Sequence, residues 1–316
     1  MHVGVVILPE HSWPQARDIW KEVEDLGFDH AWTYDHLAWR SLSRKPWYSA
    51  VPTLAAAAVT TRTIGLGTLV TSPNFRHPVL LAKDAMSLDD LSGGRITLGI
   101  GAGSADADEH VVGAEVLAPV QRAERFGEFV SALDRLLCEP VTDVDGRYYT
   151  INEAPVIPGC VQRPRVPFAI AAAGPKGIRL AARHAQIWVT NGDPRRVREL
   201  PEPELLTLIG DQLALLRREC EALGRDPSDV RAMVNGSVVG EGPVASLDAF
   251  VDFASRCAEL GFTDLTVHYP RTEGIFAGDR VDFARIMAEA LPVVRDIRPR
   301  SRATQSQSAR EDREIT

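Results

Sequence analysis

Short apolar runs rich in β-branched residues alternate with longer amphipathic segments along almost the whole chain, and this alternation limits the possible folds. The runs expected to be strands cover residues 2–8, 30–36, 64–71, 95–103, 166–174, 185–192, 230–240 and 264–270. The segments predicted as helices cover residues 14–28, 47–59, 77–94, 119–138, 175–184, 202–223, 246–260 and 280–297. Strands that alternate with helices pair in parallel through right-handed crossovers. Eight such units favour a closed α/β fold, a (β/α)8 TIM barrel, over an open doubly wound sheet.

One segment interrupts this alternation. VTDVDGRYYTI (141–151) places two β-rich runs on either side of Asp145-Gly146, which is typical of a β-hairpin. We therefore predict a TIM barrel with insertions, including a β-hairpin after the fourth helix, as a single domain over residues 1–297. The polar tail over 298–316 has no hydrophobic periodicity, so we expect it to be disordered.

Charge and cysteine content argue against several classes of function. The chain has 35 Lys and Arg against 43 Asp and Glu, a net charge of −8, and its arginines are scattered; this argues against nucleic acid or an anionic membrane as the partner. The N-terminal MHVGVVILPEH has no basic leader, so we interpret it as a strand and not a signal peptide. The four cysteines are far apart, which favours reduced thiols in a cytoplasmic protein over a disulfide framework.

The active site of a TIM barrel lies at the carboxyl ends of its strands, and those ends therefore supply the candidate residues. They carry Tyr34-Asp35-His36, Ser72-Pro73-Asn74, Gly101-Ala102-Gly103-Ser104, Ala173-Gly174-Pro175-Lys176, Thr190-Asn191-Gly192 and His268-Tyr269. No spacing of His, Asp and Glu indicates a metal site, and no GxSxG nucleophile motif occurs. This combination is typical of a site that depends on an organic cofactor.

His36 is the candidate catalytic residue because imidazole can donate or accept a proton near neutral pH. Asp35 could orient His36, or it could contact something else, since adjacent residues of an extended strand point to opposite faces. A structural histidine hydrogen-bonded at the rim is the alternative. His268 could have either role, whereas His77 is interpreted as a helix-entry residue.

AAAGPKGIR (171–179) begins a predicted helix whose first N–H groups would be free. With positive charge from Lys176 and Arg179, such a turn can bind phosphate or carboxylate; an ordinary strand-to-helix turn with a solvent-facing lysine is the alternative. GIGAG (99–103) would let a flat molecule approach the backbone, although glycine also serves tight packing.

Two stretches, TSPNFRHPVLLAKDAMSLDDLSGGRITLGIGAG (71–103) and AAAGPKGIRLAARHAQIWVTNG (171–192), resemble the luciferase-like monooxygenase superfamily of flavin and deazaflavin oxidoreductases. The resemblance extends over about residues 1–297 and implies a TIM barrel with an insertion where the hairpin is predicted. The sequence is most similar to the actinobacterial branch that uses coenzyme F420, a deazaflavin that transfers hydride.

This resemblance implies roles for individual residues. His36 would be the proton donor or acceptor beside the reactive carbon of the cofactor, with Asp35 as a cofactor contact. A non-proline cis peptide at Leu69–Val70 would form a bulge that supports the ring, with Ser72 nearby. The remaining implied cofactor contacts are Ala102, Gly103 and Ser104 near the ring system and Ala173, Gly174, Lys176, Gly177 and Thr190 on the phosphate side.

The chain departs from the family pattern at Ser104. F420-dependent sugar-phosphate dehydrogenases of this family have a catalytic glutamate at this position, whereas here Asp106, Asp108 and Glu109 only follow it. The departure argues against oxidation of a sugar phosphate by the same acid and base.

The implied function is hydride transfer between reduced F420 and a small organic substrate. An FMN-dependent monooxygenase and a non-catalytic flavin- or deazaflavin-binding homologue are the alternatives, and family analogy implies a homodimer. In the loop 37–49, Trp39, Trp47 and Tyr48 could line an aromatic wall of the substrate pocket, or they could pack the loop down.

Overall fold

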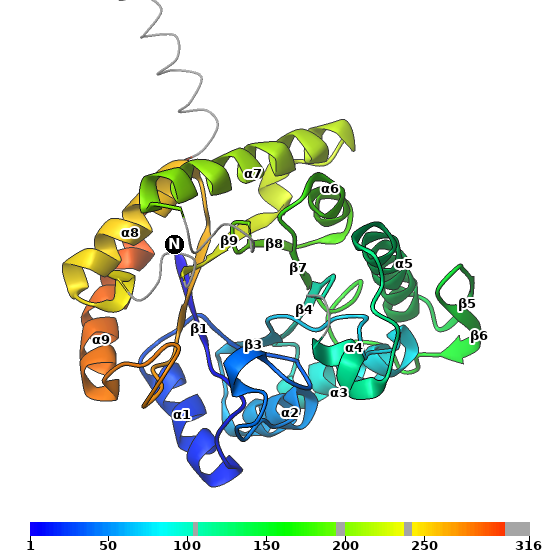
Figure 1. Ribbon diagram of the computed structural model, residues 1–316, viewed down its shortest axis with the longest axis horizontal. Coiled ribbons are helices and arrows are strands. Elements are labelled where there is room, and N and C mark those ends of the chain that lie inside the picture. Colours follow the sequence, from blue (N-terminus) through cyan, green and yellow to red (C-terminus); the bar gives the residue numbers. More distant parts are fainter. Residues whose placement is uncertain (104–106, 194–199, 237–241, 301–316) are drawn as a thin grey trace, which may run out of the picture.

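The computed structural model describes residues 1–103, 107–193, 200–236 and 242–300, and its centre is a closed barrel of parallel strands in the order β1-β10-β9-β8-β7-β4-β3-β2 (Figure 1). The strands are β1 (His2–Val6), β2 (His30–Thr33), β3 (Gly65–Thr68), β4 (Ile96–Gly101), β7 (Phe168–Ala171), β8 (Ile187–Thr190), β9 (Arg231–Asn235) and β10 (Asp264–His268). The predicted barrel is confirmed. Seven of the strands end two or three residues earlier than predicted, because the chain leaves the sheet there to form the rim loops. The predicted end of the strand over 230–240 lies outside the described residues.

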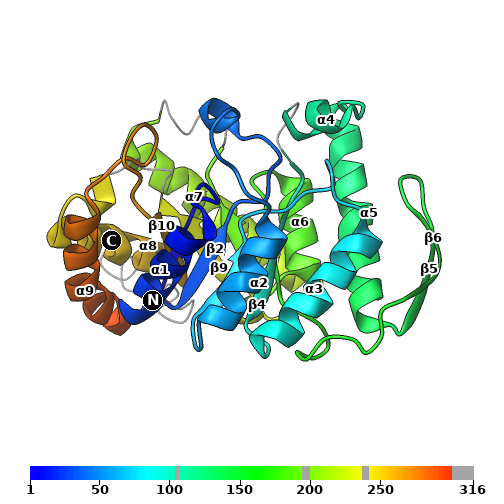
Figure 2. The ribbon, with the colours of Figure 1, turned by 90° about the horizontal axis from the view of Figure 1, so that it is seen from below.

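Helices cover the outside of the barrel (Figures 1 and 2). They are α1 (Trp13–Asp25), α2 (Ala50–Thr60), α3 (Pro78–Ser92), α5 (Pro119–Cys138), α6 (Pro175–His184), α7 (Glu202–Ala222), α8 (Leu247–Leu260) and α9 (Arg280–Asp296). The bounds of α5 and α6 match the prediction, because proline at the first helical position marks where each begins. A short helix that we did not predict, α4 (Ala107–Val112), lies near the end of the barrel where the loop after β2 also lies (Figure 2).

The predicted hairpin is present as β5 (Val141–Asp145) and β6 (Thr150–Pro155), which pair antiparallel and lie outside α5 (Figure 2). It extends beyond the predicted end at residue 151. The Glu128 carboxylate of α5 accepts hydrogen bonds from three backbone N–H groups, those of Arg147 at 3.1 Å, Tyr148 at 2.9 Å and Tyr149 at 2.7 Å. These bonds hold the turn of the hairpin against α5.

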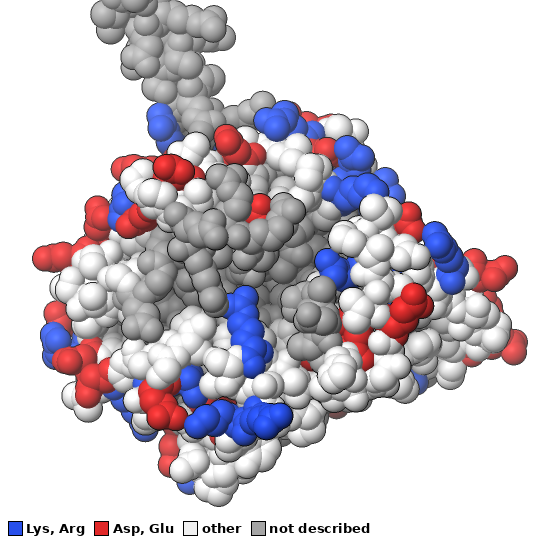
Figure 3. Space-filling model, viewed as in Figure 1, with Lys and Arg blue, Asp and Glu red and all other residues white. Residues whose placement is uncertain are grey.

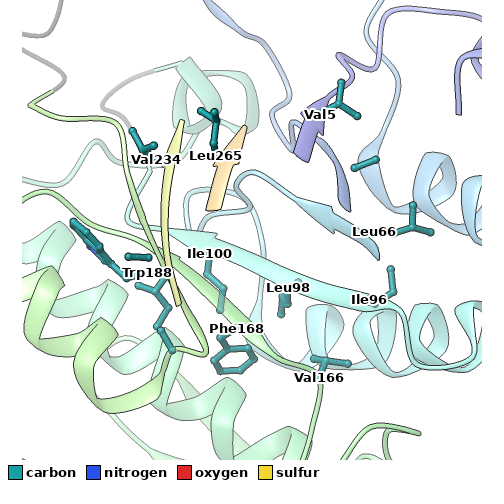
Figure 4. Packing of buried hydrophobic residues seen from close by; sticks show 14 of the residues in the cluster. Val5, Leu66, Ile96, Leu98, Ile100, Val166, Phe168, Trp188, Val234 and Leu265 are labelled. Atoms are coloured by element: carbon teal, nitrogen blue, oxygen red, sulfur yellow. The ribbon is translucent and has the colours of Figure 1, made fainter. Parts of the chain in front are cut away.

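Two hydrophobic clusters stabilise the barrel. Alternate residues of a strand point to opposite faces of the sheet, so one cluster lies outside the strands and the other lies inside them. Outward-facing side chains such as Val5, Leu98 and Trp188 pack with the helices in the larger cluster (Figure 4). The smaller cluster, which includes Val6 and Met233, comes from strands and rim loops and fills the inside of the barrel. The site therefore rests on a packed interior.

The remaining predictions on overall organisation have the following outcomes. All four cysteines are free; Cys138 is exposed and the other three are buried. Among the described residues, none of the helices combines the length and apolar character needed to cross a bilayer. The backbone N–H of Arg300, the third residue of the predicted tail, donates to the carbonyl of Ala258 in α8 at 2.8 Å. The rest of that tail, 301–316, lies outside the described residues.

Candidate active site

The carboxyl ends of the barrel strands open onto a single face, as the strand order requires. In the view of Figure 1, the described Lys, Arg, Asp and Glu side chains are scattered over the surface and do not form one patch of a single sign (Figure 3). Most of the predicted site residues lie around this mouth, but Ser104 falls in the segment 104–106, outside the described residues.

His36 follows β2 and forms a close pair with Asp108 of α4. Its Nδ1 lies 2.7 Å from Asp108 Oδ2, and Asp108 Oδ1 accepts a hydrogen bond from the backbone N–H of Leu37 at 2.7 Å. The Asp108 side chain is only 3% exposed. A carboxylate held at Nδ1 favours the tautomer with the proton on Nδ1 and leaves Nε2 as the nitrogen that can exchange a proton. We did not predict this role for Asp108; the only sequence signal was an acidic run after a strand end.

Asp35 is buried just after the end of β2, and its carboxylate pairs with Arg76. Its two carboxylate oxygens accept hydrogen bonds from Arg76 Nε at 3.0 Å and Nη2 at 2.7 Å. This bidentate ion pair joins the loops that follow β2 and β3. The Asp35 carboxylate is thus engaged by Arg76, and a contact between Asp35 and a cofactor stays a prediction.

The end of β3 has the predicted geometry, because the peptide bond between Leu69 and Val70 is cis. A Cβ on Gly101 of the neighbouring β4 would lie 2.6 Å from Val70 Cγ2, and a Cβ on Gly99 would overlap a carbonyl oxygen of β3. These two glycines therefore serve close packing of β4 against the bulge. Ser72 is buried, and its Oγ accepts a hydrogen bond from a backbone N–H two residues later at 3.4 Å.

A buried polar cluster ties α4 to α5 and to the loop after β3. Glu109 is fully buried, and its Oε1 lies 3.6 Å from Arg125 Nη2. Arg125 Nη2 also donates to Asn74 Oδ1 at 2.6 Å. Gly103 has φ +78, and a Cβ there would overlap the Asn74 side chain. The half-buried Ala102 and Gly103 thus form a backbone turn against this cluster.

The first turn of α6 has the features expected of an anion site. Its N-cap residue Gly174 provides no side-chain hydrogen bond, open space surrounds the Gly174 Cα, and Lys176 is exposed. A Cβ on Gly177 would lie 2.9 Å from the side chain of Ala172, so glycine is needed for close packing there. Arg179 forms a bidentate ion pair with Glu219, and its contribution to an anion site stays a prediction.

Thr190 and Ala173, at the ends of β8 and β7, are joined by Gln212 of α7. Thr190 Oγ1 lies 2.5 Å from Gln212 Oε1, and Gln212 Nε2 donates to the carbonyl of Ala173 at 3.1 Å. Gln212 is only 7% exposed. We did not predict its role, which no local motif indicates; a glutamine in the middle of an amphipathic helix is the sole signal.

His268 is a buried, hydrogen-bonded residue beside this mouth. Its Nε2 lies 2.8 Å from the Tyr34 hydroxyl. Burial lowers the pKa of His268 to about 3 and raises the pKa of Tyr34, so both groups are neutral near pH 7. His77, in agreement with its interpretation as a helix-entry residue, is the N-cap of α3.

Comparisons with known proteins show similarity in sequence and in fold. The sequence profile of the luciferase-like monooxygenase family matches residues 1–241. The chain is 33% identical to 4-hydroxyprotoasukamycin monooxygenase of Streptomyces nodosus subsp. asukaensis, over 61% of this chain and 53% of that protein. It is 31% identical to F420-dependent glucose-6-phosphate dehydrogenase of Microbacterium testaceum, over 60% of this chain and 56% of that protein. The chain thus spans little more than half the length of these curated relatives.

The fold is shared with solved structures. An F420-dependent secondary alcohol dehydrogenase in complex with an F420-acetone adduct superposes with a TM-score of 0.76 at 18% identity, covering 93% of this chain and 99% of that chain. At this identity the likeness establishes the fold alone.

Proposed function

Because the chain belongs to the luciferase-like monooxygenase family, we propose that it is a coenzyme F420-dependent oxidoreductase that transfers hydride between the reduced deazaflavin and a small organic substrate. The observation that carries the proposal is the His36–Asp108 pair at the barrel mouth, 2.7 Å apart, because hydride transfer to or from a polar bond needs a matching proton. The similarity to an F420-dependent dehydrogenase supports the choice of cofactor.

The residues present fit such a cofactor. The uncapped first turn of α6, with the exposed Lys176 and the open space at Gly174, would bind its phosphate. The bulge at Leu69–Val70 would support one face of its ring. When bound, F420 supplies the carbon that donates or accepts hydride.

The remaining steps belong to side chains of this chain. His36 Nε2 would donate the proton to the substrate, or accept it, while Asp108 holds Nδ1 and stabilises the imidazolium that forms on protonation. The packed interior below the mouth, which includes Val6 and Met233, would exclude water from the reacting atoms.

Fluorescence titration of the purified chain with F420 and, separately, with FMN tests the cofactor. We expect saturable binding of F420 and at least tenfold weaker binding of FMN. Tight binding of FMN alone would overturn the proposal in favour of an FMN-dependent monooxygenase. The Streptomyces relative is named as a monooxygenase.

Turnover of reduced F420 with a panel of organic acceptors tests the role of His36. His36→Ala should abolish turnover and leave F420 binding within a few-fold of the wild type. Unchanged turnover would remove His36 from the mechanism, and binding of F420 without any turnover would favour a non-catalytic homologue.

We further propose that the protein is a cytoplasmic homodimer, by analogy with the family. A monomer in light scattering at micromolar concentration would contradict the dimer.

A further inference from the structure

A pocket of about 370 Å³ lies between α1 and α2, which pack side by side on the outside of the barrel (Figures 1 and 2). Its side walls are residues that recur at helical spacing on each helix, Trp13, Ala16 and Trp20 of α1 and Pro52, Thr53 and Ala56 of α2. Its back wall includes Ile7, just after β1, and Thr33, the last residue of β2. The volume lies within the range of small-molecule sites, roughly 300–1,000 Å³. We call this space the α1–α2 pocket.

The α1–α2 pocket is separate from the proposed cofactor site. Its wall residues Ile7, Ala16 and Trp20 belong to the larger hydrophobic cluster, between the strands and the helices. Neither His36 nor any of the residues proposed to bind the cofactor lines it. A molecule in the α1–α2 pocket would therefore not occupy the place proposed for the cofactor.

The surface of the α1–α2 pocket is mainly apolar. The hydroxyl groups of its two threonines already have partners in the chain. Thr33 Oγ1 donates to the carbonyl of Ile7 at 2.8 Å, and Thr53 Oγ1 donates to the carbonyl of Ser49 at 2.9 Å. A bound molecule would therefore gain free energy chiefly by removing apolar surface from water.

The α1–α2 pocket offers no counter-ion to a charged molecule. Among the described residues that line it, none is Lys, Arg, Asp or Glu. His11 lines it, and burial lowers the pKa of His11 below its ordinary value, so this ring is neutral near pH 7. The neighbouring Glu10 forms a bidentate ion pair with Arg271 at 2.7 and 2.8 Å. A charged molecule would lose its hydration here and find no partner in return.

The rim of the α1–α2 pocket is held in place and is open to solvent. The backbone N–H of Tyr48, a rim residue, donates to the carbonyl of Pro9 at 2.6 Å. The preceding residue, Trp47, donates from its indole N–H to the carbonyl of His36 at 2.8 Å. Tyr48 and Pro52 are exposed, so the pocket can be entered on this side without unfolding a helix.

We propose that the α1–α2 pocket is a second ligand site of this protein, which binds a small, neutral, largely apolar molecule independently of the cofactor. The size of the pocket, its apolar walls and the lack of charged groups in its lining carry the inference. It does not depend on the proposed function, because no residue of the hydride-transfer site takes part.

A pair of probes that differ in charge tests the ligand class in the full chain without cofactor. 2-Acetylnaphthalene is neutral, whereas 2-naphthoate has the same bicyclic ring and nearly the same size but carries a negative charge near pH 7. In equilibrium dialysis we expect saturable binding of 2-acetylnaphthalene that is about tenfold tighter than that of 2-naphthoate, because the pocket offers the carboxylate no partner. Equal binding, or no binding of the neutral probe, would overturn the proposal.

Filling the α1–α2 pocket should remove the site. We expect Ala56→Phe to weaken binding of 2-acetylnaphthalene about tenfold or more, because the new ring takes up space between the helices. Ala16→Leu, on the opposite wall, should have the same effect and replaces the first variant if that variant does not fold. Val59→Phe adds the same ring to α2 at a position that is 68% exposed and does not line the pocket. This matched control should change binding less than twofold.

Unchanged binding of 2-acetylnaphthalene in a folded Ala56→Phe or Ala16→Leu variant would overturn the inference. An F420 titration of the same samples separates the two proposals. We expect Ala56→Phe to leave F420 affinity within twofold of the wild type, whereas a parallel loss of both ligands would place the probe at the barrel mouth and contradict a second site. Binding of the probe with the expected response to Ala56→Phe, but without F420 binding to the wild type, would support the α1–α2 pocket and contradict the proposed cofactor.

Discussion

Asp108→Asn most directly tests the pairing of Asp108 with His36, because it removes the charge of the side chain and leaves its shape almost unchanged. In the wild type, Asp108 Oδ2 lies 2.7 Å from His36 Nδ1, and Oδ1 accepts the N–H of Leu37 at 2.7 Å. The asparagine side chain can keep the Leu37 hydrogen bond through its amide oxygen. It then presents an NH2 group to His36, which favours the opposite imidazole tautomer and places the proton on Nε2.

The expected loss follows from the strength of the bond that is removed. A hydrogen bond to a charged group contributes about 1.5–3 kcal/mol and a neutral one about 0.5–1.5 kcal/mol. The difference, roughly 1–2 kcal/mol, corresponds to roughly a 5- to 30-fold fall in kcat/KM. The Asp108 side chain is 3% exposed, so solvent screening reduces this effect little.

The assay follows oxidation of reduced F420 by absorbance, with an acceptor that the wild type turns over. F420 affinity, measured by fluorescence, should stay within twofold of the wild type. Asp90→Asn, a change of the same chemistry on the exposed side of α3, serves as the control. A kcat/KM within twofold of the wild type in a folded Asp108→Asn variant would refute the assignment of Asp108 as the residue that positions His36.

Three further predictions concern the stability and chemistry of the barrel. In urea unfolding, Gly99→Ala should cost several kcal/mol, because its Cβ would overlap a carbonyl oxygen of β3, whereas Gly127→Ala, in open space within α5, should add about 0.5–1 kcal/mol. The His184 ring, whose Nδ1 lies 3.6 Å from Asp134 Oδ2, and Arg165, whose Nε donates to Asp134 Oδ1 at 2.7 Å, hold the pKa of Asp134 at about 2, below its ordinary 3.8. That contribution to stability is complete above about pH 4 and is lost as the pH falls towards 2, so acid unfolding should shift less with pH in Asp134→Asn than in the wild type; equal shifts would contradict it. A thiol reagent should modify the exposed Cys138 first and reach all four cysteines only after unfolding; simultaneous modification of the native chain would contradict the buried positions.

The barrel could be predicted from sequence because its signals are local and repeated. Each strand-helix unit carries its own hydrophobic periodicity, and helices such as α5 and α6 begin at a proline that marks the boundary. The hairpin could also be predicted, because Asp145-Gly146 lies between two β-rich runs. The bulge at Leu69–Val70 followed from family resemblance, since no periodicity reveals it.

The side-chain partners of the site could not be predicted in the same way, because they are distant in sequence. His36 and Asp108 are 72 positions apart, and α4 is too short to show a helical pattern. Thr190 of β8 and Gln212 of α7, whose side chains are in contact, are likewise 22 positions apart. A glycine at a strand end is ambiguous for a different reason: the same residue suits a bound ring or a close-packed neighbour. The contacts in the structure, such as those at Gly99 and Gly101, identify the second case.

The ion pair between Glu10 and Arg271 has a consequence for the order in which the molecule assembles. It joins the loop after β1 to the loop after β10, at the seam where the first and last barrel strands pair. During synthesis, Arg271 is added only after almost the entire barrel sequence, so the Glu10 carboxylate has no ion-pair partner until then. This side of the mouth therefore takes its final shape only after the seam has closed, and a chain that ends before Arg271 would leave the carboxylate of Glu10 without its counter-ion.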